Sequence, residues 1–181
     1  MSNKKILAFG ASNSKNSINK KLATYATTLL KNSDFTFIDL NDYEMPLFSV
    51  DREKDEGIPQ LAYDFRSLVE SHDGIIISFA EHNGAYTVAF KNIFDWISRI
   101  DGSTWGDTPI LLLGTSPGGR GASSVLEMAS KRLPFNGGFV HDTFSLPFFV
   151  KNFETGIGIT NEEKLEEMIR KLDAFEKSLR K

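Results

Sequence analysis

The chain has 181 residues, 40% hydrophobic and 25% charged, and these values are typical of one globular domain that can bury a sizeable core. Its net charge of −3 comes from 21 basic and 24 acidic residues spread along the chain, which argues against a nucleic-acid partner. The absence of cysteine excludes disulfides and thiolate chemistry, and no apolar run approaches the ~20 residues of a membrane span.

Five apolar segments predict strands, and helical patterns separate them. In chain order they are Lys4–Gly10, Phe35–Asp39, Gly74–Ser78, Pro109–Thr115 and Gly138–Phe144. Three of them are continuous apolar runs, as expected for strands buried on both faces of a parallel sheet. The apolar part of the first segment is too short for a secretory signal, so we expect a cytoplasmic protein with no membrane partner.

Apolar residues at helical spacing predict the helices between these strands. Ser17 is expected to cap the first helix, and Thr160 the last, where Glu163 would complete a capping box. The expected buried faces are Leu22, Ala23, Ala26, Leu29 and Leu30 in the first helix, Ile58, Leu61, Ala62, Phe65, Leu68 and Val69 in the second, and Leu165, Met168, Ile169, Leu172 and Phe175 in the last. The alternation of strand and helix predicts a single doubly wound α/β domain over residues 1–181.

The helix expected over Thr87–Ile100 is apolar around more of its circumference than one sheet face requires. Its apolar residues are Val88, Ala89, Phe90, Ile93, Phe94, Trp96, Ile97 and Ile100. The helix is either a well-buried central helix or one that also packs against another subunit.

Three small, polar or glycine-rich segments follow the first, third and fourth predicted strands. They are GASNSKNSIN (Gly10–Asn19), FAEHNGAY (Phe79–Tyr86) and TSPGGRGAS (Thr115–Ser123). In an open parallel sheet, ligands bind beyond the carboxyl ends of the strands. We therefore expect these three loops to form one site.

The first loop lacks both the GxGxxG and the P-loop pattern, but it leads into a helix N-terminus, which attracts anions. Ser12, Ser14, Ser17 and Asn19 could add donors to a phosphate cradle. An ordinary capped turn is the alternative.

The second loop contains Glu81, His82 and Asn83 before Gly84. His82 could titrate near neutrality or offer a flat ring to another ring, and Glu81 beside it could form an acid/base pair. A solvated surface histidine is the alternative.

The third loop contains GTSPG (Gly114–Gly118), which matches the G-x-S-x-G nucleophile elbow. However, Pro117 has no N–H for an oxyanion hole, and the only downstream His and Asp partners are the adjacent His141 and Asp142. We therefore interpret its glycines as backbone brought close to a flat ligand. The three histidines have no metal-binding spacing, and no metal is expected.

Together, ASNSKNSIN, AEHNGAY and FKNIFDWISR resemble the NADPH-dependent FMN reductase family of flavodoxin-like proteins. The family patterns are G-S-x-R-x-x-S-x-N, P-E-Y-N-x-S and K-N-x-x-D-W, in this order. Ser14, Ala80 and His82 stand where the patterns have Arg, Pro and Tyr. The resemblance implies a three-layer flavodoxin-like sandwich with a five-stranded parallel sheet in the order 2-1-3-4-5.

The resemblance also implies which residues would bind FMN. Ser12, Ser14, Ser17, Ile18 and Asn19 would surround the phosphate, and Glu81, His82, Asn83, Gly84, Ser116, Gly118 and Gly119 would line the flavin ring. Lys91 and Trp96 would shape the Thr87–Ile100 helix and a subunit contact.

The implied activity is transfer of a hydride from NADPH or NADH to FMN and then to a small acceptor such as a flavin, a quinone or an azo compound. No protein side chain would be catalytic, and the implied assembly is a homodimer or a dimer of dimers. A flavodoxin-like electron carrier without nicotinamide turnover is the main alternative, and a sensor that has lost its cofactor is another.

Overall fold

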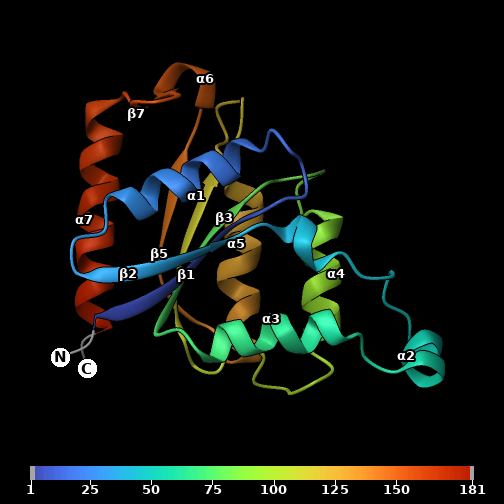
Figure 1. Cartoon of the computed structure of the whole chain (residues 1–181). Coiled ribbons are helices and arrows are strands. Elements are labelled where there is room, and N and C mark those ends of the chain that lie inside the picture. Colours follow the sequence, from blue (N-terminus) through green and yellow to red (C-terminus); the bar gives the residue numbers. More distant parts are fainter. Residues whose placement is uncertain (1–2, 180–181) are drawn as a thin grey trace.

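A parallel five-stranded sheet lies between two layers of helices in the computed structural model, which describes residues 3–179 (Figure 1). The strand order is β2-β1-β3-β4-β5, and every neighbouring pair is parallel. The strands are β1 (Lys4–Ala11), β2 (Ser33–Ile38), β3 (Gly74–Phe79), β4 (Pro109–Thr115) and β5 (Phe139–Leu146). The flavodoxin-like strand order implied by the sequence is therefore confirmed.

The helices cover both faces of this sheet. α1 (Ile18–Thr28) and α7 (Glu162–Ser178) pack on one face, while α3 (Gln60–Glu70), α4 (Val88–Ile97) and α5 (Ser123–Arg132) pack on the other. Shorter elements are η1 (Leu40–Tyr43), α2 (Val50–Glu56), η2 (Leu133–Asn136), α6 (Phe149–Asn152), and an antiparallel hairpin of β6 (Phe153–Glu154) and β7 (Gly158–Ile159). None of the helices within residues 3–179 has the length and hydrophobicity that crossing a bilayer requires.

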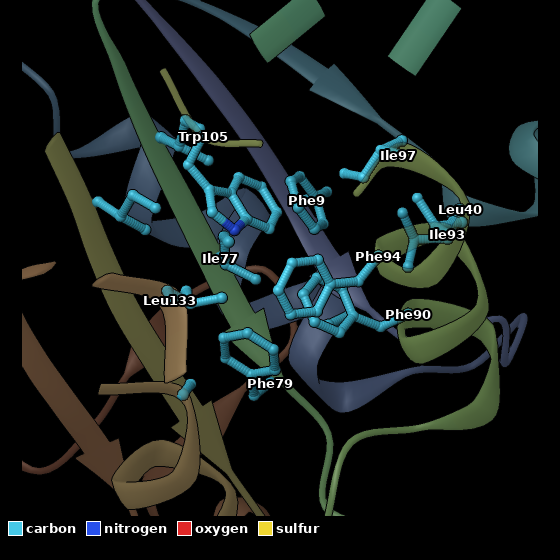
Figure 2. Packing of buried hydrophobic residues seen from close by; sticks show 14 of the residues in the cluster. Phe9, Leu40, Ile77, Phe79, Phe90, Ile93, Phe94, Ile97, Trp105 and Leu133 are labelled. Atoms are coloured by element: carbon cyan, nitrogen blue, oxygen red, sulfur yellow. The ribbon is translucent and has the colours of Figure 1, made fainter. Parts of the chain in front are cut away.

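The central strands are buried on both faces, as their continuous apolar runs predict. All of β3 and nearly all of β1 and β4 are buried. Alternate residues of β1 point to opposite faces, so Phe9 contacts the α3–α5 layer, whereas Ala8 belongs to the core beneath α1 and α7. Figure 2 shows the first of these cores, where Phe9, Phe79 and Phe90 pack together.

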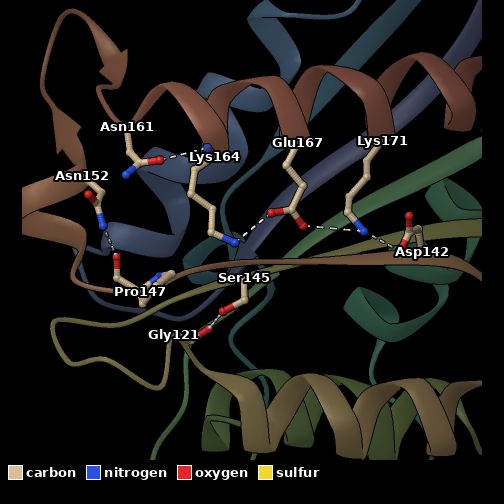
Figure 3. A network of polar contacts seen from close by, with 9 residues as sticks. All are labelled: Gly121, Asp142, Ser145, Pro147, Asn152, Asn161, Lys164, Glu167 and Lys171. Atoms are coloured by element: carbon tan, nitrogen blue, oxygen red, sulfur yellow. Dashed lines mark hydrogen bonds and ion pairs between the residues drawn. The ribbon is translucent and has the colours of Figure 1, made fainter.

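The predicted boundaries differ from the structure at several ends. β1 and β3 are each one residue longer than predicted, β2 begins at Ser33, and β5 extends to Leu146. The predicted Thr160 cap of the last helix is wrong. Because that helix begins at Glu162, the preceding residue Asn161 caps it, and its Oδ1 accepts from the Lys164 N–H at 3.0 Å (Figure 3).

The apolar surface of α4 is largely covered within the chain. Phe94 packs against Trp105 with 5.6 Å between ring centroids, and the Trp96 Nε1–H donates to the Pro46 carbonyl at 2.7 Å. Phe48 lies edge-on to Trp96. The burial of these residues therefore has an intramolecular cause. Val88 is the large apolar side chain that α4 leaves exposed.

Candidate functional site

The side chain of Asn19 joins the ends of three elements at the carboxyl edge of the sheet. Its Oδ1 accepts from the Ser78 hydroxyl at 2.9 Å and from the Thr115 N–H at 3.0 Å, and its Nδ2 donates to the Thr115 carbonyl at 3.1 Å. Asn19 is buried near the start of α1, while Ser78 and Thr115 lie near the ends of β3 and β4. Because an unpaired buried amide would be costly, this network fixes the first loop against β3 and β4.

The first loop passes very close to the helix that it precedes. A Cβ on Gly10 would lie 2.6 Å from the Lys20 backbone nitrogen, so only glycine fits there. Ser17 caps α1 as predicted, its Oγ accepting from the Lys20 N–H at 3.2 Å. The Ser12 Oγ accepts from the Ser14 N–H at 3.2 Å.

Several backbone N–H groups of this loop have no protein acceptor within the described part of the chain. They belong to Asn13, Lys15, Asn16, Ile18 and Asn19. Free N–H groups at a helix N-terminus, next to serine hydroxyls, form the donor set that binds a phosphate. The Ser17 cap is therefore confirmed, and the predicted phosphate cradle would use the same loop.

The second loop begins with a tight turn that presents His82 to solvent. His82 and Ala85 form an antiparallel bridge, and the two residues between them both have positive φ, 53° at Asn83 and 77° at Gly84. Asn-Gly is the preferred pair for such a type I′ turn. The Tyr86 ring packs against Phe79, and burial raises the pKa of its hydroxyl to about 12.

The Glu81 carboxylate is directed toward α5 and not toward His82. Its Oε2 accepts from the Val125 N–H at 3.1 Å in the first turn of α5. Ala122, which precedes α5, has no side chain that could cap the helix. Glu81 therefore accepts from an N–H that the helix itself leaves unpaired, and its negative charge interacts favourably with the positive end of the helix dipole. The sequence analysis did not predict this role.

The third loop is bonded to the end of β5 and the residues after it, and it has free space at Gly118. The N–H groups of Phe148 and Phe149 donate to the carbonyls of Gly118 and Ser116, each at 3.0 Å. A Cβ on Gly121 would lie 2.3 Å from the Ser145 Oγ, which donates to the Gly121 carbonyl (Figure 3). By contrast, a Cβ on Gly118 would have no atom within 4 Å.

The contacts of Ser116 do not form a hydrolase triad. Its hydroxyl donates to the Gly118 carbonyl at 3.1 Å. His141 packs beside Phe175, and Asp142 pairs with Lys171 at 2.7 Å (Figure 3). Neither therefore acts as a base for Ser116, in agreement with the argument from Pro117.

Two further residues at this edge were not predicted from the sequence. The Thr87 hydroxyl caps α4 and donates to the Ala11 carbonyl at 2.9 Å, so it ties the second loop to the first. A threonine directly before an apolar helix is a capping signal that could have identified it. Phe148 has φ 50°, which is rare for an aromatic residue, and Asn83 and Ala122 on neighbouring loops also have positive φ. Such strain is common at functional sites.

A cleft of about 420 Å³ opens beside the first and second loops. Asn13 and His82 lie on its border with those loops, and Glu44 is the one carboxylate among the residues that line it. Its other lining residues are Leu40, Asn41, Tyr43, Met45, Leu47, Thr87, Val88, Ala89, Asn92 and Ile93. The described residues contain no group of three or more His, Asp or Glu side chains that could hold a metal ion.

The family profile of NADPH-dependent FMN reductases matches residues 4–151. A 2-hydroxy-1,4-benzoquinone reductase from Burkholderia sp is 36% identical over 110 residues, which cover 60% of this chain and 58% of the relative. A quinone reductase from Escherichia coli is 28% identical over 41% of this chain and 40% of its own length. The chain thus matches about half of the length of these two relatives.

Solved structures share the fold over almost the whole chain. FerB, a flavoenzyme NAD(P)H:(acceptor) oxidoreductase from Paracoccus denitrificans, has a TM-score of 0.79 at 23% identity, and the match covers 97% of each chain. An azoreductase from Bacillus anthracis has a TM-score of 0.59 at 17% identity over 97% of this chain and 98% of its own. With a family match over most of its length and this fold, the chain belongs to the NADPH-dependent FMN reductase family.

Proposed function

We propose that this protein is an FMN-dependent NAD(P)H oxidoreductase that reduces a small acceptor of the quinone or azo type. The observation that carries the proposal is that the three loops follow neighbouring strands at one edge of the sheet, where Asn19 bonds the first loop to the ends of β3 and β4. Family membership and the names of the quinone reductase relatives support the same reaction class.

The residues at this edge fit FMN. The unpaired N–H groups of Asn13, Lys15, Asn16 and Ile18 would hold the phosphate, together with the hydroxyls of Ser12, Ser14 and Ser17. Asn19 would act by holding this loop in place, because its amide oxygen is already occupied by Ser78 and Thr115.

The flavin ring would lie along the second and third loops. His82, Asn83 and Gly84 would border one side of it, and Ser116, Gly118 and Gly119 the other. The open space above Gly118 lets the backbone approach a flat ring, and Glu81 would hold the start of α5 beside it.

When bound at these residues, FMN would supply the two-electron chemistry that links the nicotinamide to the acceptor. The chain contributes position and environment. Backbone N–H groups fix the phosphate, the glycines leave room for the ring, and His82 and Asn13 connect this site with the neighbouring cleft. That cleft is large enough for a planar acceptor or a nicotinamide ring.

A homodimer or a dimer of dimers through the α4 region and a cytoplasmic location are further parts of this proposal. Val88 is the exposed apolar residue of α4 and is therefore the position to test. A Val88→Glu protein should elute later than the wild type in gel filtration with light scattering if this face joins two subunits. If the Val88→Glu protein has the same mass as the wild type, Val88 does not lie in a subunit contact.

Anaerobic steady-state assays test the activity directly. The purified protein loaded with FMN should oxidise NADPH or NADH when a quinone is added, with ping-pong kinetics because both substrates use one site. A protein that holds FMN but is reduced only by chemical or protein donors would instead be an electron carrier.

A further inference from the structure

A second cavity, of about 570 Å³, lies between α1 and the β6–β7 hairpin. In Figure 1 the β7 end of this hairpin lies near α1, at the end of the sheet where the strands lead into the loops. The groove is lined by Lys15, Ser17, Lys20, Lys21, Thr24, Tyr25, Thr28, Phe153, Thr155, Gly156, Ile157 and Gly158. Its volume is within the ~300–1,000 Å³ range of small-molecule sites.

The groove is positively charged and has an aromatic wall. Its lining includes Lys15, Lys20 and Lys21 but no carboxylate. Lys20 forms an ion pair with Asp39. Burial raises the pKa of Asp39, but the contact with Lys20 and the hydrogen bonds from Asn41 lower that pKa overall, so the pair is charged. Lys15 and Lys21 have no ion-pair partner within residues 3–179 and remain available for an anion.

The aromatic wall is built by close packing between the hairpin and α1. Tyr25 and Phe153 meet edge to face with 5.6 Å between ring centroids. Gly158 has φ 109°, and a Cβ there would lie 2.0 Å from the Tyr25 ring, so only glycine lets the hairpin come this close. The exposed parts of such rings offer a surface on which a base can stack.

The groove is continuous with the phosphate cradle. Ser17, which caps α1 inside the cradle, also lines the groove, and Lys15 belongs to the same loop. One face of α1 and its cap lines the groove, at positions 17, 21, 24, 25 and 28. A ligand whose phosphate occupied the cradle could therefore extend along this face.

We propose that this groove is a subsite for the adenosine monophosphate half of a flavin dinucleotide. The inference rests on the proposed function, because it assumes a flavin phosphate in the Ser12–Ser17 cradle. Lys15 and Lys21 would then receive the second phosphate of FAD, and Tyr25 and Phe153 its adenine ring. The chain would accept FAD as well as FMN, and its own lysines would decide the preference between the two.

Binding of FMN and of FAD to the apoprotein, followed by isothermal titration calorimetry, tests this subsite without any assay of turnover. Lys21→Glu is the diagnostic variant, since Lys21 is exposed and the change should not disturb folding. Lys54→Glu on α2 is the matched control, because it makes the same charge change outside the groove.

The wild-type protein should bind FAD at least as tightly as FMN. Lys21→Glu should weaken FAD binding by roughly tenfold relative to its effect on FMN, as expected for one charge-assisted contact, and Lys21→Arg should restore it. FAD binding much weaker than FMN binding, or equal losses for both flavins in Lys21→Glu, would overturn the subsite and leave the proposed function intact. Failure of both flavins to bind would overturn the proposed function itself.

Discussion

Ser17 and Asn19 lie two positions apart but have different tasks at the candidate site. The Ser17 hydroxyl caps α1 and lies at the border of the cradle and the neighbouring groove. The Asn19 amide is buried and bonds to Ser78 and Thr115. The sequence pattern predicts both near a phosphate, but only the structure shows that the Asn19 amide is already bonded within the chain, whereas Ser17 lies at the groove.

Ser17→Asp tests the cradle at the scale of a single residue. Aspartate caps helices about as well as serine, so the free energy of unfolding should change by less than about 0.5 kcal/mol. A carboxylate a few ångström from a phosphate should weaken FMN binding roughly a hundredfold at low salt, since such repulsion is on the order of 3 kcal/mol. Fluorescence titration of the apoprotein with FMN measures this loss.

Ser49→Asp is the matched control, because Ser49 caps α2 in the same way. It should leave FMN affinity unchanged. Equal affinities in the Ser17→Asp protein and the wild type would show that the phosphate binds elsewhere.

At the scale of elements, the glycine-rich loop after β4 has space for an added Cβ at one glycine and no space at the other two. A Cβ at Gly118 would meet nothing within 4 Å, whereas at Gly119 it would lie 2.7 Å from the Phe148 ring, and at Gly121 it would collide with Ser145. The end of β5 and the segment that follows it therefore support the loop from one side, and Phe148 has a strained backbone conformation as part of that support.

Gly118→Ala should therefore weaken FMN binding without lowering the stability of the fold. The melting temperature should stay close to that of the wild type because nothing opposes the added methyl group. FMN binding should weaken severalfold or more, because that methyl group would occupy the space expected for the flavin ring. Gly10→Ala is the contrasting variant and should be strongly destabilised, since its Cβ would lie 2.6 Å from backbone. Unchanged FMN binding in Gly118→Ala would remove this loop from the site.

Asp73 ties the start of β3 to β1 and makes part of the stability depend on pH. Its carboxylate accepts from the Lys5 N–H and pairs with Lys4, each at 2.9 Å. The Lys5 hydrogen bond is the largest cause, and the pKa of Asp73 is lowered from 3.8 overall despite some burial. The stabilisation is therefore fully present above pH 3.8 and is lost as the pH falls through the lower pKa of the folded state.

Asp73→Asn should be less stable than the wild type at pH 7, and the difference should shrink below pH 4 as the wild-type carboxylate is protonated. Urea denaturation at a series of pH values measures both trends. Asp55→Asn, at an exposed position of α2, is the control and should show no such convergence. A constant difference at all pH values would assign the effect of Asp73→Asn to lost packing.

At the scale of the whole molecule, the sheet and its order could be predicted because the central strands are continuous apolar runs and the loop motifs resemble a known family. The short elements could not be predicted from the sequence. No residue of α2 is buried, and β6 and β7 have only two residues each, so none of the three has a periodic apolar pattern. Contacts such as Asn19 with Thr115 or Glu81 with Val125 join distant parts of the chain and depend on the completed fold. The sequence therefore predicts a candidate site at this edge of the sheet, but it does not assign the partner of each polar group.

The central claim is tested most directly by the visible spectrum of the FMN-loaded protein during an anaerobic titration with NADPH. We predict flavin absorbance bands that bleach on addition of the nicotinamide and return when a quinone is added. Bands that persist with NADPH would contradict an NAD(P)H oxidoreductase and indicate an electron carrier. A protein that takes up no FMN would contradict the site itself.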